Sequence, residues 1–342
     1  MRKLAIVGIL AAVACDKGGG APTPSTTTAP AVASSAPAAP APTFDPGQLA
    51  VFAPLPEKIE RPDNLLTPEK VALGKTLYFD PKLSKGKDVS CNACHDVTKN
   101  GASETQRGRR NAPTIFNAAG GFAQGWDARG TLVEDFVIAH AAEPDVMSQG
   151  DKALVQAVAA SPAYVAAFKK AFPDEKGAIT TDTIGKALGA YTRKLLTPSR
   201  WDKFLAGDAS ALTDAEKAGL AAFLDANCMT CHAGKYIGAA QTQKLGVAKP
   251  WPVAPGRAED LGRFEVTKQD VDRHVFKVPT LRNVTKTSPY LHDGSMSSLE
   301  ENVKLMARHQ VGKELDDARV KAIVTFLGAL EGEPPKDLVT KP

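Results

Sequence analysis

Apolar side chains recur at helical spacing in four segments of the chain, and these segments form two similar pairs. The first pair opens with a helix that Thr67 caps ahead of Pro68 and that continues to Tyr78. The second pair opens with a helix whose capping box joins Thr213 to Glu216. No run alternates apolar and polar residues well enough to predict a sizeable sheet. The pattern therefore predicts an all-α protein with an internal repeat.

Each opening helix leads to a Cys-x-x-Cys-His motif, which is the attachment motif of a c-type haem. In such a motif the two thiols bind the haem vinyl groups, and the adjacent His ligates the iron from the proximal side. One copy would also fit a redox dithiol or half of a zinc site. Two copies favour two covalent haems, because a zinc site would not place a His directly after the second Cys twice. The residues are Cys91, Cys94 and His95 in the first copy and Cys228, Cys231 and His232 in the second.

A helix followed by this motif is how small cytochrome c domains begin. Each unit should close with a second helix, predicted over residues 181–195 in the first unit and 316–330 in the second. Pro198 marks the boundary between them. We therefore expect two cytochrome c-like domains in tandem, at residues 46–197 and 198–342, each with one covalent haem.

The N-terminal segment has the features of an export signal. A basic start precedes a short apolar run, Leu4 to Val13, which is too short to span a bilayer and is typical of a signal peptide. The run ends at Cys15 in a sequence like a lipoprotein cleavage box, so residues 1–15 are predicted to be a signal that leaves a lipid on Cys15. The alternative is an ordinary cleaved signal with an incidental Cys. Both place the chain outside the cytoplasm, in the periplasm, with residues 16–45 as a disordered Ala/Pro/Thr/Ser-rich tether.

Cysteine count and net charge argue against a disulfide framework and against a nucleic-acid partner. Four of the five cysteines belong to the two motifs, so no disulfide framework remains to be proposed. The formal net charge is only +4, and haem propionates would offset it. Nucleic acid is therefore not an implied partner.

The chain resembles the bacterial di-haem cytochrome c peroxidases and the related di-haem maturation enzyme for tryptophan tryptophylquinone, over about residues 65–330. The resemblance implies that hydrogen peroxide is reduced to water at the N-terminal haem. It also implies that electrons enter at the C-terminal haem from a small c-type cytochrome or a cupredoxin. Family members are often dimers, so a homodimer is expected among the partners. The matching stretches are residues 77–84, 90–95, 110–118, 126–129, 202–207, 278–284 and 288–294.

The resemblance also assigns metal ligands. It implies that Met306 is the sixth ligand of the second haem, where a thioether raises the potential. Met296 is the competing candidate, and a core Met is the plain alternative. The maturation enzyme has Tyr at this position, so Met306 favours the peroxidase branch.

A calcium ion is implied as well, between the two domains. Its ligands map onto the side chain of Asn111 and the carbonyls of Thr287 and Pro289, an oxygen set that suits a hard cation. Otherwise Asn111 would simply cap a turn. Trp126 matches the family's inter-haem Trp, which relays electrons, or else it packs the domain interface.

The chain departs from the family where peroxide chemistry needs a base. The family's Gln and Glu fall on Phe136 and Val146, and the loop at residues 96–109 contains no His. His140 follows Phe136 by one helical turn in a helix predicted over residues 131–141, so both face the same way.

We therefore expect His140 to act as the acid–base group at neutral pH. It could instead bind the iron, or be a core or surface His, and Glu143 and Asp145 are further candidates. Two rival functions remain open at the level of sequence. One is a non-enzymatic di-haem electron carrier, and the other is a di-haem oxidase of another substrate.

Overall fold

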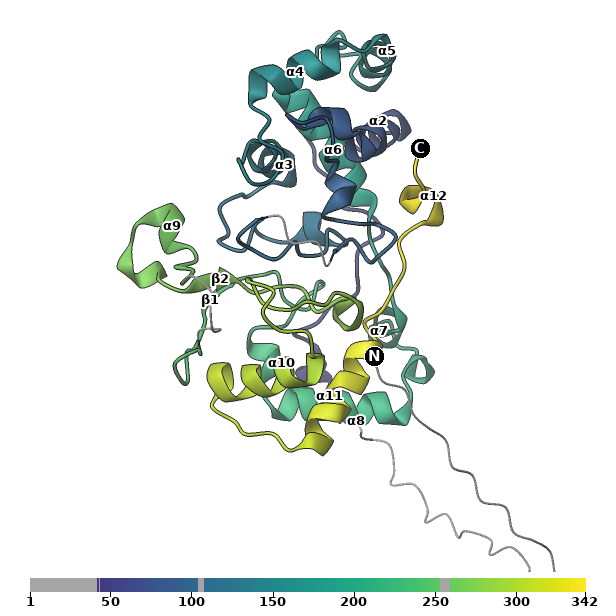
Figure 1. The fold of residues 1–342 in the computed structure, drawn as a ribbon. Coiled ribbons are helices and arrows are strands. Elements are labelled where there is room, and N and C mark those ends of the chain that lie inside the picture. The colour runs from purple at the N-terminus through teal and green to yellow at the C-terminus, as the bar shows by residue number, and fades with distance from the viewer. Residues whose placement is uncertain (1–41, 43, 104–107, 253–258) are drawn as a thin grey trace, which may run out of the picture. The chain divides into compact units, whose positions relative to one another are not determined.

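The computed structural model describes residues 42, 44–103, 108–252 and 259–342, and it is predominantly helical (Figure 1). The helices are α1 (Pro46–Leu49), α2 (Pro68–Phe79), α3 (Val133–Ala141), α4 (Asp151–Ala159), α5 (Pro162–Ala171), α6 (Thr181–Lys194), α7 (Arg200–Leu205), α8 (Asp214–Asp225), α9 (Phe264–Thr267), α10 (Leu299–Met306), α11 (Asp317–Gly328) and α12 (Lys336–Val339). Two short strands, β1 (Thr242–Lys244) and β2 (Val275–Lys277), pair antiparallel and form the sheet of the described residues. The expected helical class is confirmed.

The first helix pair is α2 and α6. The Thr67 hydroxyl accepts a hydrogen bond from the amide of Lys70 and caps α2, as predicted. The two helices touch at Gly74, where a Cβ would lie 1.9 Å from the carbonyl oxygen of Ala187. Only a residue without a side chain permits this backbone contact. The core around it is made of buried apolar side chains, among them Leu77 and Ile184.

The second helix pair, α8 and α11, repeats this construction. The predicted capping box is present, because Thr213 and Glu216 bond each other's backbone amides. A Cβ at Gly219 would lie 2.1 Å from the carbonyl oxygen of Ala322, so α8 and α11 are also in backbone contact. The internal repeat predicted from the apolar pattern is therefore a repeat of structure.

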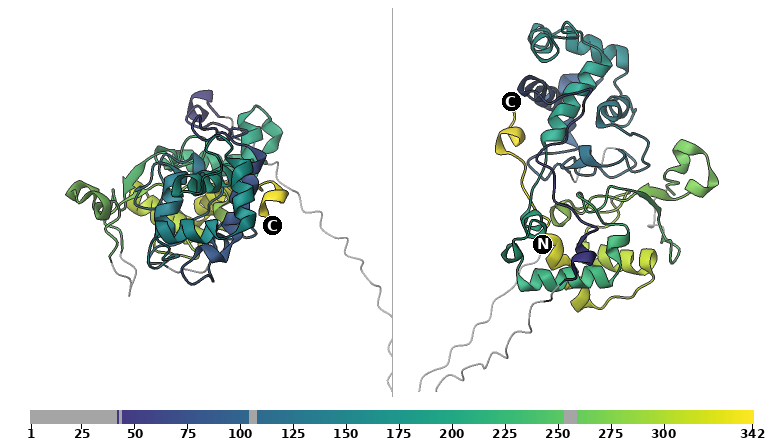
Figure 2. Two further views of the ribbon diagram at one scale, coloured as in Figure 1. Left: turned by 90° about the horizontal axis from the view of Figure 1, so that it is seen from above. Right: turned by 180° about the vertical axis from the view of Figure 1, so that it is seen from behind.

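The two ends of the described chain cross between the helix pairs. Phe52, near the beginning, is buried in the core around the second pair. Leu338 of α12 is buried in the core around the first pair, where the Tyr191 hydroxyl donates to its carbonyl at 2.8 Å. Figures 1 and 2 show α12 beside α2. The domain limits at residues 46–197 and 198–342 stay a prediction. Phe52 and Leu338 each pack in the core of the helix pair that lies outside their own predicted domain.

The predicted signal, Cys15 and nearly all of the tether lie outside the described residues. No helix in the described ranges combines the length and the apolar character needed to cross a bilayer.

Candidate active site

One cavity of about 850 Å³ reaches both Cys-x-x-Cys-His motifs. Its walls are mainly apolar side chains contributed by both helix pairs. The structure thus brings together residues that the sequence separates by more than a hundred positions. The motif residues that line it are Cys91, Cys94, His95, Cys228, Cys231 and His232.

His95 is oriented by two hydrogen bonds. Its amide donates to the carbonyl of Cys91 at 3.0 Å, in the short turn that ends the motif. Its Nδ1–H donates to the carbonyl of Pro113 at 2.9 Å, which leaves Nε2 as the available ring nitrogen. Burial, aided by the nearby His140, lowers the pKa of His95 to about 4, so the imidazole is neutral at neutral pH. A neutral imidazole anchored through one nitrogen is the state that ligates a metal.

His232 occupies the corresponding place in the second motif. Its amide donates to the carbonyl of Cys228 at 2.9 Å. Burial lowers the pKa of His232 to about 4, and its Nδ1 is a buried atom without a hydrogen-bond partner among the described residues. Gly238, with φ of 108°, lets the chain at Pro279 pass close by, because a Cβ there would lie 2.2 Å from the Pro279 carbonyl oxygen.

A second repeat, Pro-Thr-x-x-Asn, supplies the segments next to both imidazoles. In each copy the Thr hydroxyl bonds a carbonyl of the motif loop, and the Asn is in the left-handed region. Our sequence interpretation missed this repeat as a structural unit, although its letters are visible once the chain is aligned on itself. The copies are Pro113 to Asn117 and Pro279 to Asn283.

Met306 is the last residue of α10 and lines the cavity. A turn of π-helix, Ala307–Val311, follows it directly, an irregularity often found at functional sites. The competing Met296 is not among the residues that line the cavity, and its carbonyl instead accepts a hydrogen bond from Tyr290. Two thiol pairs, two imidazoles and a thioether on mainly apolar walls fit two haem groups.

Trp126 also lines the cavity. Its Nε1–H donates to the carbonyl of Asn111 at 2.9 Å, and its own carbonyl accepts from the amide of Lys277 at 2.7 Å. Its ring lies edge-on to His292, with centroids 6.5 Å apart. Trp126 is therefore fixed between segments that come from both motif regions.

Of the predicted calcium ligands, Asn111 and Pro289 are in direct contact. The Asn111 side chain donates to the carbonyls of Pro289 at 2.6 Å and Leu291 at 3.2 Å, while Thr287 is also on the cavity wall. Calcium would require the side-chain oxygen of Asn111 in place of its NH₂ group. The calcium site stays a prediction.

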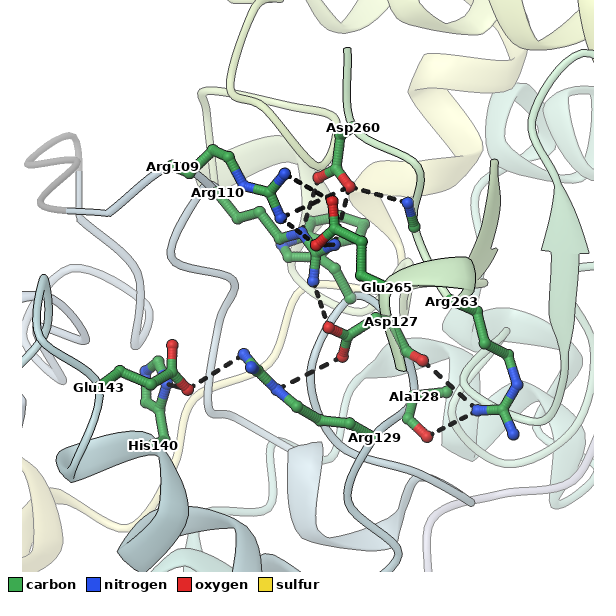
Figure 3. Close-up of polar contacts among 12 residues, drawn as sticks. Arg109, Arg110, Asp127, Ala128, Arg129, His140, Glu143, Asp260, Arg263 and Glu265 are labelled. Atoms are coloured by element: carbon green, nitrogen blue, oxygen red, sulfur yellow. Dashed lines mark hydrogen bonds and ion pairs between the residues drawn. The ribbon is translucent and has the colours of Figure 1, made fainter. Parts of the chain in front are cut away.

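His140 lies in α3 and faces the same cavity as Phe136, whose ring stacks on it at a centroid distance of 5.3 Å. The His140 Nδ1 is 2.9 Å from Oε1 of Glu143, and Arg129 Nη2 is 3.1 Å from the same oxygen (Figure 3). Burial alone would raise the pKa of Glu143, but the hydrogen bond with His140 and the charges of His140 and Arg129 outweigh burial and lower it. Asp145 lines the cavity as well.

A partly buried network of arginines and carboxylates continues from this site (Figure 3). Arg129 Nε lies 3.5 Å from Asp127, and Asp127 pairs with Arg110. Arg110 then bonds Asp260 twice at 2.7 Å and Glu265 at 3.3 Å. Our sequence interpretation missed it, because Asp260 is 150 residues from Arg110 and no local pattern joins them.

Comparisons with known proteins agree with this geometry. Residues 68–210 match the family model described as "Di-haem cytochrome c peroxidase". The cytochrome c551 peroxidase of Nitrosomonas europaea is 38% identical over 84% of this chain and 87% of the relative. That of Pseudomonas aeruginosa is 37% identical over 84% and 86%. A solved MauG-like protein associated with microbial copper homeostasis has the same fold, with a TM-score of 0.70 and 23% identity over 84% of this chain and 95% of that one.

Proposed function

Because the chain belongs to the di-haem cytochrome c peroxidase family, we propose that it reduces hydrogen peroxide to water with two covalently bound c-type haems and a small cytochrome as electron donor. The reaction consumes one peroxide, two electrons and two protons and yields two waters. The observation that carries the proposal is the cavity that both Cys-x-x-Cys-His motifs line. When bound, the haems supply the iron at which peroxide is reduced and at which electrons are stored.

The residues of the chain divide this work between the two motifs. Cys91 and Cys94 would hold the haem of the peroxide site, and His95 would ligate its iron. Cys228 and Cys231 hold the haem of the electron entry site. His232 and Met306 would ligate its iron, and a thioether ligand would keep its potential high. A c-type cytochrome or a cupredoxin is the donor class.

We assign the acid–base step to His140. Peroxide reduction needs a group that takes a proton from one peroxide oxygen and returns it to the departing oxygen. Glu143 engages Nδ1 of His140, so Nε2 is the ring nitrogen left to exchange that proton. The family's Gln and Glu are replaced by Phe136 and Val146, both on the cavity wall, and neither can carry a proton. Glu143 therefore orients the base, and Arg129 holds Glu143 ionised.

Two further features of the cavity belong to the same proposal. Trp126, fixed between Asn111 and Lys277 on the cavity wall, would relay electrons between the two haems. The side-chain oxygen of Asn111, once its amide is turned over, and the carbonyls of Thr287 and Pro289 would hold a calcium ion.

The chain works in the periplasm as a lipoprotein tethered at Cys15, and two copies associate as a homodimer. The apolar run before Cys15 supports export, and the homodimer is proposed because members of the family are often dimers.

The test is an absorption spectrum of the half-reduced holoprotein, with and without calcium, followed by peroxide turnover with reduced cytochrome c. The proposal expects one five-coordinate, high-spin haem and sustained turnover. Two low-spin haems that ignore peroxide would mean that both irons are capped, as in an electron carrier. In that case His140→Ala should open one iron, because His140 is an imidazole on the cavity wall that belongs to neither motif.

A further inference from the structure

Lys277 is the last residue of β2, and its side chain lies on the cavity wall. Its backbone is fixed on two sides. The amide donates to the carbonyl of Trp126 at 2.7 Å, and the residue pairs with Thr242 of β1 across the two-stranded sheet. Lys277 is therefore held on the cavity wall beside Trp126.

The ammonium of Lys277 makes no hydrogen bond or ion pair with any described residue. The neighbouring cations behave differently, because Arg110 bonds Asp127 and Asp260 and Arg129 pairs with Glu143. Burial lowers the pKa of Lys277 to about 8, against the opposing charge of Asp127. A buried cation without a partner destabilises the protein unless another group pairs with it. Lys277 is half-buried and lines the cavity that the haems would fill.

We propose that Lys277 binds a propionate carboxylate of one of the two haems and thereby acts as a positioning residue for electron transfer past Trp126. The inference rests on the two covalent haems of the proposed function. A propionate is the anionic group that a haem brings into an apolar cavity. Its bond to an ammonium is charge-assisted and stronger than a neutral hydrogen bond.

The pairing has a consequence for the redox equilibrium. Reduction removes one positive charge from the iron, so a nearby cation favours the ferrous state and raises the potential. Removing Lys277 should therefore make the affected haem harder to reduce. Asp127 is the carboxylate that competes with a propionate for the Lys277 ammonium. Its Oδ1 is buried without a hydrogen bond and lies 3.5 Å from Arg129.

The test compares three variants by spectroelectrochemical titration of both haems. Lys277→Met removes the ammonium, and Lys277→Arg keeps a positive charge. Lys244→Met is the matched control, because Lys244 is an exposed lysine of the same sheet. In Lys277→Met, we expect the reduction equilibrium of one haem to shift about tenfold towards the ferric state, which is about 59 mV for one electron. Lys277→Arg should keep most of the wild-type reduction potential, and the potentials of Lys244→Met should equal those of wild type.

Two unchanged potentials in a Lys277→Met protein that holds two haems would overturn the inference. A haem assay made first separates this outcome from failure of the proposed function, since a wild-type chain without two covalent haems contradicts the function itself. If the Lys277 variants lose haem, the structure of the wild-type holoprotein decides. A Lys277 Nζ within 4 Å of a propionate oxygen supports the pairing, and an ion pair with Asp127 alone rejects it.

Discussion

Nδ1 of His140 lies 2.9 Å from Oε1 of Glu143, one helical turn along the chain where α3 ends. This contact fixes the orientation of the imidazole ring. One nitrogen is committed to the carboxylate, and the other is left for the cavity that holds His95. The same carboxylate is held from its other side by Arg129. The proposed acid–base group His140 is therefore held by Glu143, which Arg129 holds in turn.

Replacing His140 by Ala should lower peroxide turnover by about a hundredfold or more, because the proton would have to pass through water alone. Steady-state turnover with a reduced cytochrome measures it. His309→Ala is a suitable control, since His309 is not on the cavity wall and its ring bonds the Pro250 carbonyl. Unchanged turnover in His140→Ala would remove His140 from the acid–base step.

Replacing Glu143 by Gln should make the protein's stability less dependent on pH. The folded-state pKa of Glu143 is lowered, so its ionised form stabilises the fold above its ordinary value of about 4.3, and this contribution is lost as the pH falls through the lowered pKa. The difference in unfolding free energy between wild type and Glu143→Gln should be largest at neutral pH and should shrink in acid.

Denaturant titrations at several pH values measure that difference. Glu333→Gln, at an exposed position, provides the control. A gap between wild type and Glu143→Gln that stays constant down to acid pH would show that the ion pairs of Glu143 with His140 and Arg129 do not stabilise the fold.

Local sequence signals predicted the helices and the motifs well. Thr67 and the pair Thr213 with Glu216 cap their helices as expected, because capping depends on residues within one turn. The apolar spacing that predicted the closing helices also holds, as α6 and α11 show.

Long-range features were beyond the same reasoning. The pairing of Arg110 with Asp260 and the return of Leu338 to the first core depend on chain segments that meet only after folding. Sequence could place His140 and Phe136 on one face of a helix, but it could not show that Glu143 would bond the imidazole. The position of Glu143 follows from how the chain turns after α3.

Replacing Met306 by Leu should lower the potential of the second haem, because a thioether ligand stabilises the ferrous state and Leu offers no ligand. The same potentiometric titration and the loss of a low-spin spectrum measure the effect. Met296→Leu is the matched control, since Met296 is partly buried in the same core but is not on the cavity wall. If Met296→Leu shifts the potential and Met306→Leu does not, the ligand assignment is reversed.

Adding a methyl group at Gly74 should destabilise the protein by about 1–3 kcal/mol, as overpacking of a tight contact does. A Cβ there would lie 1.9 Å from the Ala187 carbonyl oxygen, and a backbone atom cannot rotate away, so α2 and α6 must separate. Gly328→Ala in α11 is the control, because nothing lies within 4 Å of a Cβ at that position and Ala favours a helix over Gly. In chemical denaturation of the holoproteins, the free energy of unfolding should be lower than wild type for Gly74→Ala and equal or higher for Gly328→Ala. Equal stability of Gly74→Ala and wild type would mean that the contact between α2 and α6 is looser than the backbone approach at Gly74 indicates.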